Sequence, residues 1–253
     1  MTYEDIRVSE EDHLATITLD IPPVNVLSHR SIEELQRAFE ALDEPDRRAI
    51  VVTGGGEKMF SGGVEVEDHI GEQLPIMMEA FGDLFETMRS IETPTVAKVE
   101  GPALGGGCEV VAGCDLAIAS EEARFGQPEM NLGTFPPIAA ALFPRMVGEK
   151  RAFEIIFTGE QFGATEAEAM GLINRVVPPN EVDSATEDVV DTLLSKSGLV
   201  LGMAKRAFYE TAAADRDEAI ATATDYGIEI TDTADGQEGL TAFVEDREPE
   251  WQY

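Results

Sequence analysis

The sequence predicts an α/β protein with a parallel sheet, followed by a shorter region made only of helices. Short apolar, β-branched runs alternate with stretches of helical spacing along most of the chain, as in strands joined by helices. Two glycine-rich turns each come after one of these runs. After Pro179 only helical spacing remains. We therefore expect an α/β core over residues 1–195 and a C-terminal helical region over residues 196–253.

Five short stretches have the composition of strands. The first alternates apolar and polar residues, as a half-buried strand does, and ends before Pro22 and Pro23. The second is a β-branched run that stops at a glycine triplet, which indicates a buried strand and a turn. The other three are similar apolar runs. In chain order, the predicted strands are Leu14–Leu19, Ala49–Thr53, Thr95–Val99, Leu116–Ala119 and Leu172–Val177.

Start signals and spacing predict the helices. Ser31 is followed three residues later by Glu34, which is the capping-box pattern, so we expect a helix to begin at Ser31. The helical tail has too few apolar residues to form a domain of its own, so we expect it to pack on the core or on a neighbouring subunit. The other predicted helices are Glu72–Ile91, Glu181–Lys196, Leu199–Tyr226 and Thr233–Phe243.

Acidic residues dominate the composition and give a formal net charge of −32. Binding to nucleic acid or to anionic membranes depends on clustered lysine and arginine, so this charge argues against both kinds of partner. Asp and Glu are spread along the whole chain, with five lysines against thirteen arginines. This pattern predicts a solvated acidic shell suited to a halophilic, very salty cytoplasm; an acidic protein without salt adaptation is the alternative.

The remaining composition indicates a cytoplasmic protein. Cys108 and Cys114 are too few and too close together for a disulfide framework, which favours a reducing compartment. The first residues carry neither a basic nor an apolar signal segment. No run reaches the roughly 18 apolar residues of a membrane span. His13, His29 and His69 have no ligand spacing, so we expect no metal site.

The two glycine turns are candidates for binding an anion or a developing negative charge. The segment Gly101–Glu109 contains three consecutive glycines after the Thr95–Val99 strand and leads into a predicted helix. Such a helix start directs free N–H groups outward, although glycines required only for tight packing are the alternative. The segment Phe60–Glu65 is a second glycine turn, after the Ala49–Thr53 strand. Turns after parallel strands share one edge of the sheet, so one N–H from each can form an oxyanion hole.

Two glutamates are candidates for acid–base chemistry. Glu109 falls one turn into an otherwise apolar helix, where burial raises a carboxyl pKa toward the range that general acid–base catalysis uses. The structural alternative is a glutamate that complements the helix dipole. Glu129 is expected in a loop after a short strand, and the alternative for it is an ordinary surface residue.

Three motifs together resemble those of the enoyl-CoA hydratase/isomerase (crotonase) superfamily. Phe60-Ser-Gly-Gly-Val-Glu65 and Gly101-Pro-Ala-Leu-Gly-Gly-Gly-Cys-Glu109 are similar to its two oxyanion segments, and Phe125-Gly-Gln-Pro-Glu129 is similar to the segment of its second catalytic glutamate. The resemblance continues through Thr158-Gly-Glu, through 167–178 and to the end of the chain, near Trp251. It therefore covers nearly the whole sequence.

The resemblance implies a function and a site. Glu109 and Glu129 match the hydratase branch, in which two glutamates add water across the 2,3 double bond of an acyl-CoA thioester. The backbone N–H groups of Val64 and Gly106 match the oxyanion donors. Coenzyme A is then part of the substrate, and no separate cofactor is expected. Substrate contacts are expected at Gly62, Gly63, Gly105, Gly133, Phe135 and Pro136.

The family also implies a spiral of ββα turns with a C-terminal trimerisation region, assembled as a homotrimer or as a hexamer, a dimer of trimers. Lys205 and Arg206 in that region are expected to be solvated, with contact to the CoA phosphates as the alternative. Two rival activities follow from the same scaffold. One is double-bond isomerisation with a single glutamate, and the other is acyl-CoA binding without catalysis.

The acyl pocket departs from the family pattern. The usual glycine-rich stretch after the second glutamate is replaced by Phe135-Pro-Pro-Ile138, in which the prolines stiffen the backbone. This form, together with the segment Gly63–His69, is similar to hydratases that act on cyclic dienoyl-CoA thioesters, of the cyclohexadienecarbonyl-CoA hydratase type. We therefore expect either a straight-chain 2-enoyl-CoA or such a ring thioester as substrate.

Overall fold

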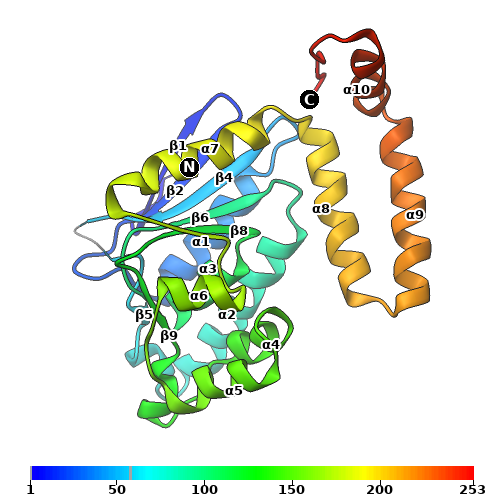
Figure 1. Cartoon of the computed structure of the whole chain (residues 1–253). Helices are drawn as coiled ribbons and strands as arrows, with labels where there is room; N and C mark the ends of the chain where they lie inside the picture. The colour runs from blue at the N-terminus through cyan, green and yellow to red at the C-terminus, as the bar shows by residue number, and fades with distance from the viewer. Residues whose placement is uncertain (1, 57–58) are drawn as a thin grey trace.

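A six-stranded sheet forms the centre of the computed structural model, which describes residues 2–56 and 59–253 (Figure 1). All neighbouring strands are parallel except the edge pair β1–β2, which is antiparallel. The sequence did not predict β1, because only Ile6 of its six residues is buried and the alternation is weak. In sheet order the strands are β1 (Ile6–Glu11), β2 (Leu14–Leu19), β4 (Ala49–Gly54), β6 (Thr95–Val99), β8 (Leu116–Ser120) and β11 (Arg175–Val177).

Repeated ββα turns build the rest of the core, so the predicted spiral fold is confirmed. Each of β2, β4 and β6 is followed by a two-residue strand in a smaller sheet and then by a helix. The small strands are β3 (Val26–Leu27), β5 (Gly63–Val64), β7 (Ala103–Leu104), β9 (Arg124–Gly126) and β10 (Phe162–Gly163). The helices that follow the first three are α1 (His29–Leu42), α2 (Gln73–Ser90) and α3 (Gly106–Gly113). This arrangement brings the ends of β5 and β7 beside α3, where both glycine turns lie.

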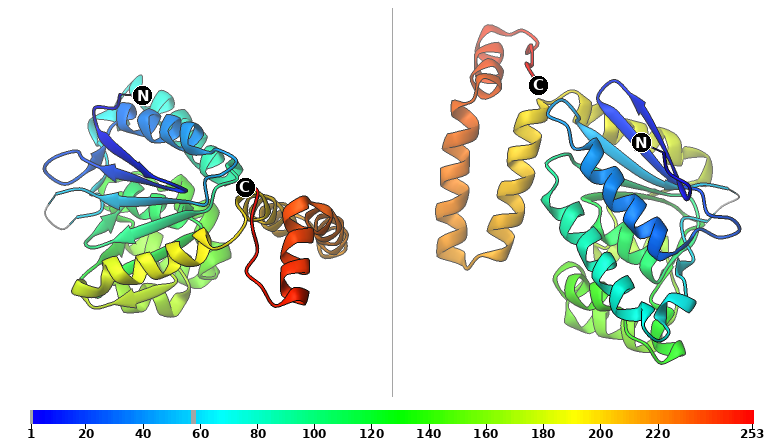
Figure 2. Two further views of the ribbon diagram at one scale, coloured as in Figure 1. Left: turned by 90° about the horizontal axis from the view of Figure 1, so that it is seen from above. Right: turned by 180° about the vertical axis from the view of Figure 1, so that it is seen from behind.

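Further helices complete the core. They are η1 (Glu67–His69), η2 (Pro128–Leu132), α4 (Pro137–Met146), α5 (Glu149–Thr158), α6 (Ala164–Met170), η3 (Pro179–Glu181) and α7 (Val182–Leu194). Helices α4, α5 and α6 lie below the sheet in the view of Figure 1, and α7 crosses its front face, as the other views in Figure 2 also show. Helix α7 packs Ala185 and Val190 against Val51, Val96 and Ile118 of the sheet. In the described part of the chain, no helix combines the length and the apolar character that crossing a membrane requires.

The first helix begins at His29, so the prediction of a start at Ser31 was wrong. Ser28 is the N-cap, and its hydroxyl accepts a hydrogen bond from the backbone N–H of Ser31 at 3.3 Å. Glu34 does not complete a capping box. Its carboxylate instead accepts the backbone N–H of Asp5 at 2.8 Å and thereby ties the N-terminal strand to the helix. Glu34 therefore makes a contact with a segment distant in sequence, and not the local capping-box contact that the motif predicted.

Two further predictions were wrong near the C-terminus. The strand predicted over Leu172–Val177 is formed only by Arg175–Val177, because Leu172 and Ile173 are buried in a turn instead. The long helix predicted over 199–226 is two antiparallel helices, α8 (Gly198–Ala213) and α9 (Arg216–Asp232). Asp215 caps the second helix by accepting the N–H groups of its first turn. Residues that favour helix lie on both sides of this turn, so the helical spacing does not reveal the break between the two helices.

Helices α8, α9 and α10 (Ala234–Glu245) form an arm that stands away from the sheet (Figures 1 and 2). Lys205 on α8 anchors the arm to the core and is buried, so the prediction that it is solvated or meets CoA was wrong. Its ammonium lies 2.9 Å from a carboxylate oxygen of Asp115 and donates to the carbonyls of Met88 and Thr93 at 3.2 and 3.0 Å. Tyr209, one turn further along α8, donates to the other oxygen of Asp115 at 2.7 Å. The ion pair is therefore fully hydrogen-bonded, as a buried pair requires.

Replacement of Lys205 by methionine is expected to lower the free energy of unfolding by roughly 3–5 kcal/mol, because the variant leaves Asp115 charged and partly buried without its partner. Chemical denaturation measures the change. Lys196→Met, at an exposed lysine, is the control and should lie within about 0.5 kcal/mol of wild type. Equal stability of the two variants would contradict the anchoring role.

Candidate active site

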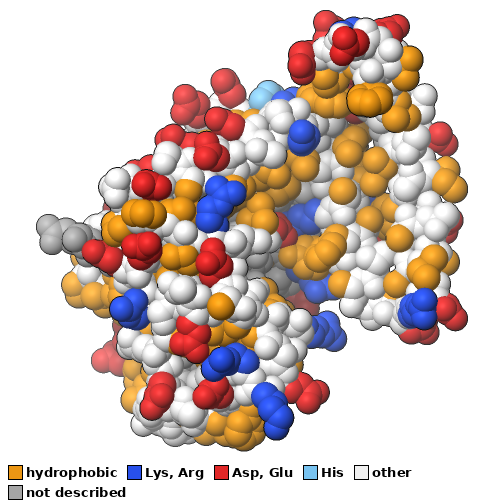
Figure 3. All heavy atoms as spheres, viewed as in Figure 1, with side chains coloured by type: hydrophobic (Ala, Val, Ile, Leu, Met, Phe, Trp, Pro, Cys, Tyr) orange, Lys and Arg blue, Asp and Glu red, His pale blue; other side chains and the backbone are white. Residues whose placement is uncertain are grey.

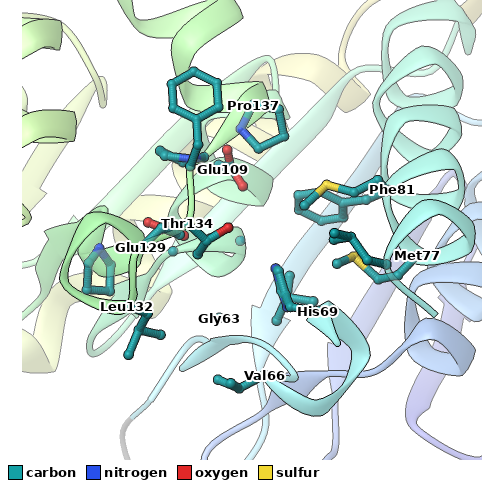
Figure 4. Close-up of a pocket in the computed structure, with 18 of the residues that line it drawn as sticks. Gly63, Val66, His69, Met77, Phe81, Glu109, Glu129, Leu132, Thr134 and Pro137 are labelled. Atoms are coloured by element: carbon teal, nitrogen blue, oxygen red, sulfur yellow. The ribbon is translucent and has the colours of Figure 1, made fainter. Parts of the chain in front are cut away.

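A pocket of about 520 Å³ lies where the two glycine turns meet the segment between η2 and α4 (Figure 4). One wall comes from the β5 turn, η1 and the start of α2, and the other from η2 and the start of α4. All the residues that the sequence suggested for the site line this pocket. They are Gly62, Gly63, Val64, Gly105, Gly106, Glu109, Glu129, Gly133, Phe135 and Pro136.

Backbone hydrogen bonds hold the two glycine turns against each other. The N–H of Leu104 donates to the carbonyl of Ser61 at 3.0 Å, and Ser61 forms a parallel bridge with Ala103. Gly106 is the first residue of α3, so its N–H has no acceptor within its own helix. A Cβ atom built on Gly106 would lie 3.6 Å from the backbone nitrogen of Val64. The backbone of Val64 therefore lies beside that of Gly106, at the point where the two turns meet.

Glu109 is the fourth residue of α3 and is only 2% exposed. Burial raises the pKa of its carboxyl group from the usual 4.5 to about 8, and the nearby charge of Glu129 acts in the same direction. Backbone hydrogen bonds oppose this shift, chiefly that from Ala139, whose N–H donates to the carboxylate at 2.6 Å. Ala139 lies in the first turn of α4, so a helix N-terminus holds the carboxylate in place.

Glu129 lies in the short 3₁₀ helix η2, not in the loop that the sequence suggested. Its side chain is half-buried, and burial raises the pKa of its carboxyl group, while the charge of His69 lowers it. Gln127 is fully buried, and its amide nitrogen, in the orientation that satisfies its neighbours, donates to both carboxylate oxygens at 3.1 and 3.2 Å. These contacts keep Glu129 directed into the pocket from the wall opposite α2 (Figure 4).

Several pocket residues were not assigned to the site from the sequence. Gln127 was missed, although its place two residues before Glu129 in one motif was a usable signal. His69 and Thr134 were missed because each reaches the pocket only through the fold. The wall facing the glutamates is mainly apolar. Met77, Met78 and Phe81, which have helical spacing, line this wall and also pack in or against the hydrophobic core. The other apolar lining residues are Val66, Ile70, Leu74 and Leu132.

The arrangement suits chemistry that moves protons beside a carbonyl oxygen. Two carboxyl groups with raised pKa values lie in one pocket, and paired amides lie next to them. Within residues 2–56 and 59–253, no group of three or more His, Cys, Asp or Glu side chains is placed to hold a metal ion.

Glutamine at position 109 is expected to make the folded protein more stable at alkaline pH. Because the folded-state pKa is about 8 against 4.5 normally, the folded state keeps a proton that the unfolded chain releases, so stability falls as pH rises through this window. Glu109→Gln removes that loss. Urea unfolding at pH 9 should show a gain on the order of 2 kcal/mol, and at pH 5 almost none.

The control for that comparison is Glu121→Gln, which changes the net charge equally at an exposed position. A gain of the same size in both variants, or one independent of pH, would attribute the effect to overall charge instead of to the buried carboxyl group.

Comparison with known proteins identifies relatives over nearly the whole chain. The family model described as enoyl-CoA hydratase/isomerase matches residues 9–253. The chain is 35% identical to a crotonyl-CoA hydratase of Syntrophomonas wolfei over 98% of this chain and 97% of that protein. It is 32% identical to a short-chain-enoyl-CoA hydratase of Clostridium acetobutylicum over 99% of this chain and 98% of that one.

Solved structures agree with these sequence matches. The crystal structure of an enoyl-CoA hydratase from Mycobacterium smegmatis superposes with a TM-score of 0.94 and 31% identity, over 99% of this chain and 100% of that chain. That fold is the spiral of ββα turns described above. The family model covers nearly all of the sequence, and the similarity to each named relative extends from end to end. The chain therefore belongs to the enoyl-CoA hydratase/isomerase (crotonase) family.

Proposed function

We propose that the protein is an enoyl-CoA hydratase that adds water across the 2,3 double bond of a 2-enoyl-CoA by two-carboxylate acid–base catalysis. The observation that carries this proposal is the placement of Glu109 and Glu129 in one pocket beside the amides of Val64 and Gly106. The curated relatives that are named hydratases support the same reaction. A double-bond isomerase requires only one carboxylate, so the presence of both favours hydration.

The geometry supports the following mechanism. The thioester oxygen binds the N–H groups of Val64 and Gly106, which stabilise the negative charge that develops as the β-carbon is attacked. The carboxyl pair carries one proton and holds one water molecule. As the water oxygen bonds to the β-carbon, one of its protons passes to the ionised carboxylate, and the protonated partner gives its proton to the α-carbon. The proton count of the pair is unchanged after one turnover.

The proposal is tested by adding purified protein to crotonyl-CoA in high-salt buffer and following the absorbance of the conjugated thioester. Loss of this absorbance, with 3-hydroxybutyryl-CoA as product, is the expected result. A folded protein that binds CoA esters but forms no hydroxyacyl product from any enoyl thioester would reject hydration and favour the non-catalytic alternative.

The acyl group is proposed to be small. Phe135, Pro136 and Pro137 at the start of α4 line one side of the pocket, and Met77 and Phe81 line another. The rigid Phe135-Pro-Pro segment also supports a cyclic dienoyl thioester as a second candidate. Turnover of crotonyl-CoA compared with that of a cyclohexadienoyl-CoA separates the two, and no activity on the ring thioester removes the second.

We also propose that residues 196–253 form an oligomerisation region of a homotrimer or of a dimer of trimers. The arm α8–α10 exposes large apolar side chains to solvent (Figure 3). They are Phe208, Ile220, Ile228, Leu240, Phe243 and Val244. Such exposure is unfavourable, and it marks a surface that another subunit covers. Sedimentation analysis tests this proposal, and a monomer at micromolar concentration in high salt would contradict it.

Salt is expected to stabilise the protein, because the acidic side chains that give the net charge of −32 repel one another in dilute buffer. Raising KCl from 0.1 M to about 2 M shortens the screening length from roughly 10 Å to below about 3 Å. The melting temperature should rise by on the order of 10 °C or more. Sucrose is the uncharged control and should give a much smaller rise. Full activity and an unchanged melting temperature after dialysis into dilute buffer would contradict the halophilic interpretation.

A further inference from the structure

Two polar side chains in the pocket have no part in the mechanism proposed above. His69 on η1 and Thr134, in the segment after η2, both line the cavity and approach it from its two walls (Figure 4). Neither Nε2 of His69 nor Oγ1 of Thr134 has a hydrogen-bonding partner among residues 2–56 and 59–253. Polar groups that line a largely apolar pocket usually bind a matching group of the ligand.

The orientation of the His69 ring is determined by its other nitrogen. Nδ1 lies 2.9 Å from the carbonyl oxygen of Glu65, and because a carbonyl only accepts, Nδ1 carries the hydrogen. Glu65 is itself held, since its N–H donates to the carbonyl of Leu27 at 2.8 Å across the β3–β5 pair. In the neutral ring Nε2 is then a hydrogen-bond acceptor, and in the protonated ring it is a donor.

The surroundings of His69 make a purely hydrocarbon ligand a poor match. Val66 and Ile70 flank it in sequence, and Met77 lies on the neighbouring start of α2. A hydrocarbon acyl group that fills this space excludes water from Nε2 and provides no hydrogen bond in exchange. A site with a polar group aimed at its ligand discriminates strongly against analogues that lack the complementary group.

We propose that Nε2 of His69, together with Oγ1 of Thr134, binds an oxygen substituent on the acyl group, so that the enzyme prefers hydroxy- or oxo-substituted 2-enoyl thioesters to plain hydrocarbon ones. Both the neutral and the protonated ring of His69 can bind such an oxygen. A hydroxyl group donates to Nε2 of the neutral ring, and a carbonyl group accepts from Nε2 of the protonated ring. The inference rests on the proposed hydratase function and specifies its substrate class.

The test compares crotonyl-CoA with 4-hydroxybut-2-enoyl-CoA, which differs by one oxygen. Wild type is expected to favour the hydroxy substrate in kcat/KM by roughly tenfold or more, the effect of about one well-made hydrogen bond. His69→Leu and Thr134→Val should each reduce this preference, and His69→Gln, which keeps a hydrogen-bonding end, should restore part of it. The readout is the ratio of the two kcat/KM values, because an effect common to both substrates, such as a change in the pKa of Glu129 when His69 is removed, cancels in that ratio.

Two outcomes overturn the inference. One is a wild type that treats both substrates alike. The other is a His69→Leu variant that loses activity equally on both, which would mean that His69 acts through Glu129, whose charge it faces. Reduced preference in both His69→Leu and Thr134→Val, with part of it kept in His69→Gln, supports the inference.

A binding experiment separates this inference from the proposed function. The saturated esters butyryl-CoA and 4-hydroxybutyryl-CoA require no chemistry, and calorimetry should show tighter binding of the hydroxy ester to wild type than to His69→Leu. That result without turnover of any enoyl thioester would keep the subsite and reject the hydratase. Equal binding of the two esters to wild type would reject the subsite, whatever the activity.

Discussion

Replacing Glu109 or Glu129 by glutamine is expected to lower kcat for crotonyl-CoA hydration by about 10³-fold or more in each case. General acid–base catalysis by one positioned group contributes roughly 10²–10⁴-fold, and here each carboxyl group has its own proton transfer. Glutamine keeps the size and the hydrogen-bond acceptor that Ala139 and Gln127 contact, so the pocket should remain intact. Steady-state kinetics should therefore show a fall in kcat with KM nearly unchanged.

The double variant, with both glutamates replaced by glutamine, shows whether Glu109 and Glu129 act together or independently. In the proposed mechanism both groups act on one water molecule, so removing the second carboxylate after the first should cost much less than the product of the single effects. Glu121→Gln at the surface is the matched control and should keep full activity. If Glu129→Gln retained most of the wild-type rate, the site would work with one carboxylate, as an isomerase does, and the hydratase proposal would be wrong.

Gly105→Ala is expected to reduce kcat by about 10²-fold or more, with the protein still folded. A Cβ atom at this position would lie 2.5 Å from Oε1 of Glu129, which is far closer than two non-bonded atoms approach. The same residue directly precedes Gly106, the proposed oxyanion donor, and its φ of +52° is rarely adopted by alanine. One substitution therefore displaces the carboxylate and strains the turn, and a shift of about 1 Å in a reacting group can cost 10²-fold.

Gly71→Ala is the matched control for backbone strain. Its φ is +67°, and a Cβ atom there meets nothing within 4 Å. The two variants should lose similar stability in chemical denaturation, while only Gly105→Ala loses activity. Equal kinetic loss in both would mean that strain, and not the clash with Glu129, explains the effect.

Local sequence patterns were sufficient to predict a strand where the burial of its residues follows directly from the order of apolar and polar residues. The strands Leu14–Leu19 and Thr95–Val99 were predicted with their observed bounds, because alternation or continuous apolar character reports burial directly. The strand β1 was missed because it lies at the sheet edge, and the break at Asp215 was missed because its flanks both favour helix. Both features are local in sequence: β1 pairs with β2 across the two-residue hairpin Asp12–His13, and Asp215 caps the first turn of α9. Neither changes the apolar or helix-forming pattern from which the elements were predicted.

The sequence by itself determined the family, the alternation of strands and helices in the core and the candidate glutamates, because these depend on motifs and patterns whose spacing is readable along the chain. Only the tertiary structure brought Glu109 under the N-terminus of α4 and placed Gln127 beside Glu129. It also placed His69 in the same pocket and buried Lys205 in an ion pair. These features arise between segments that are distant in sequence. Burial and neighbouring charge, which govern a carboxyl pKa, exist only after such segments have packed together.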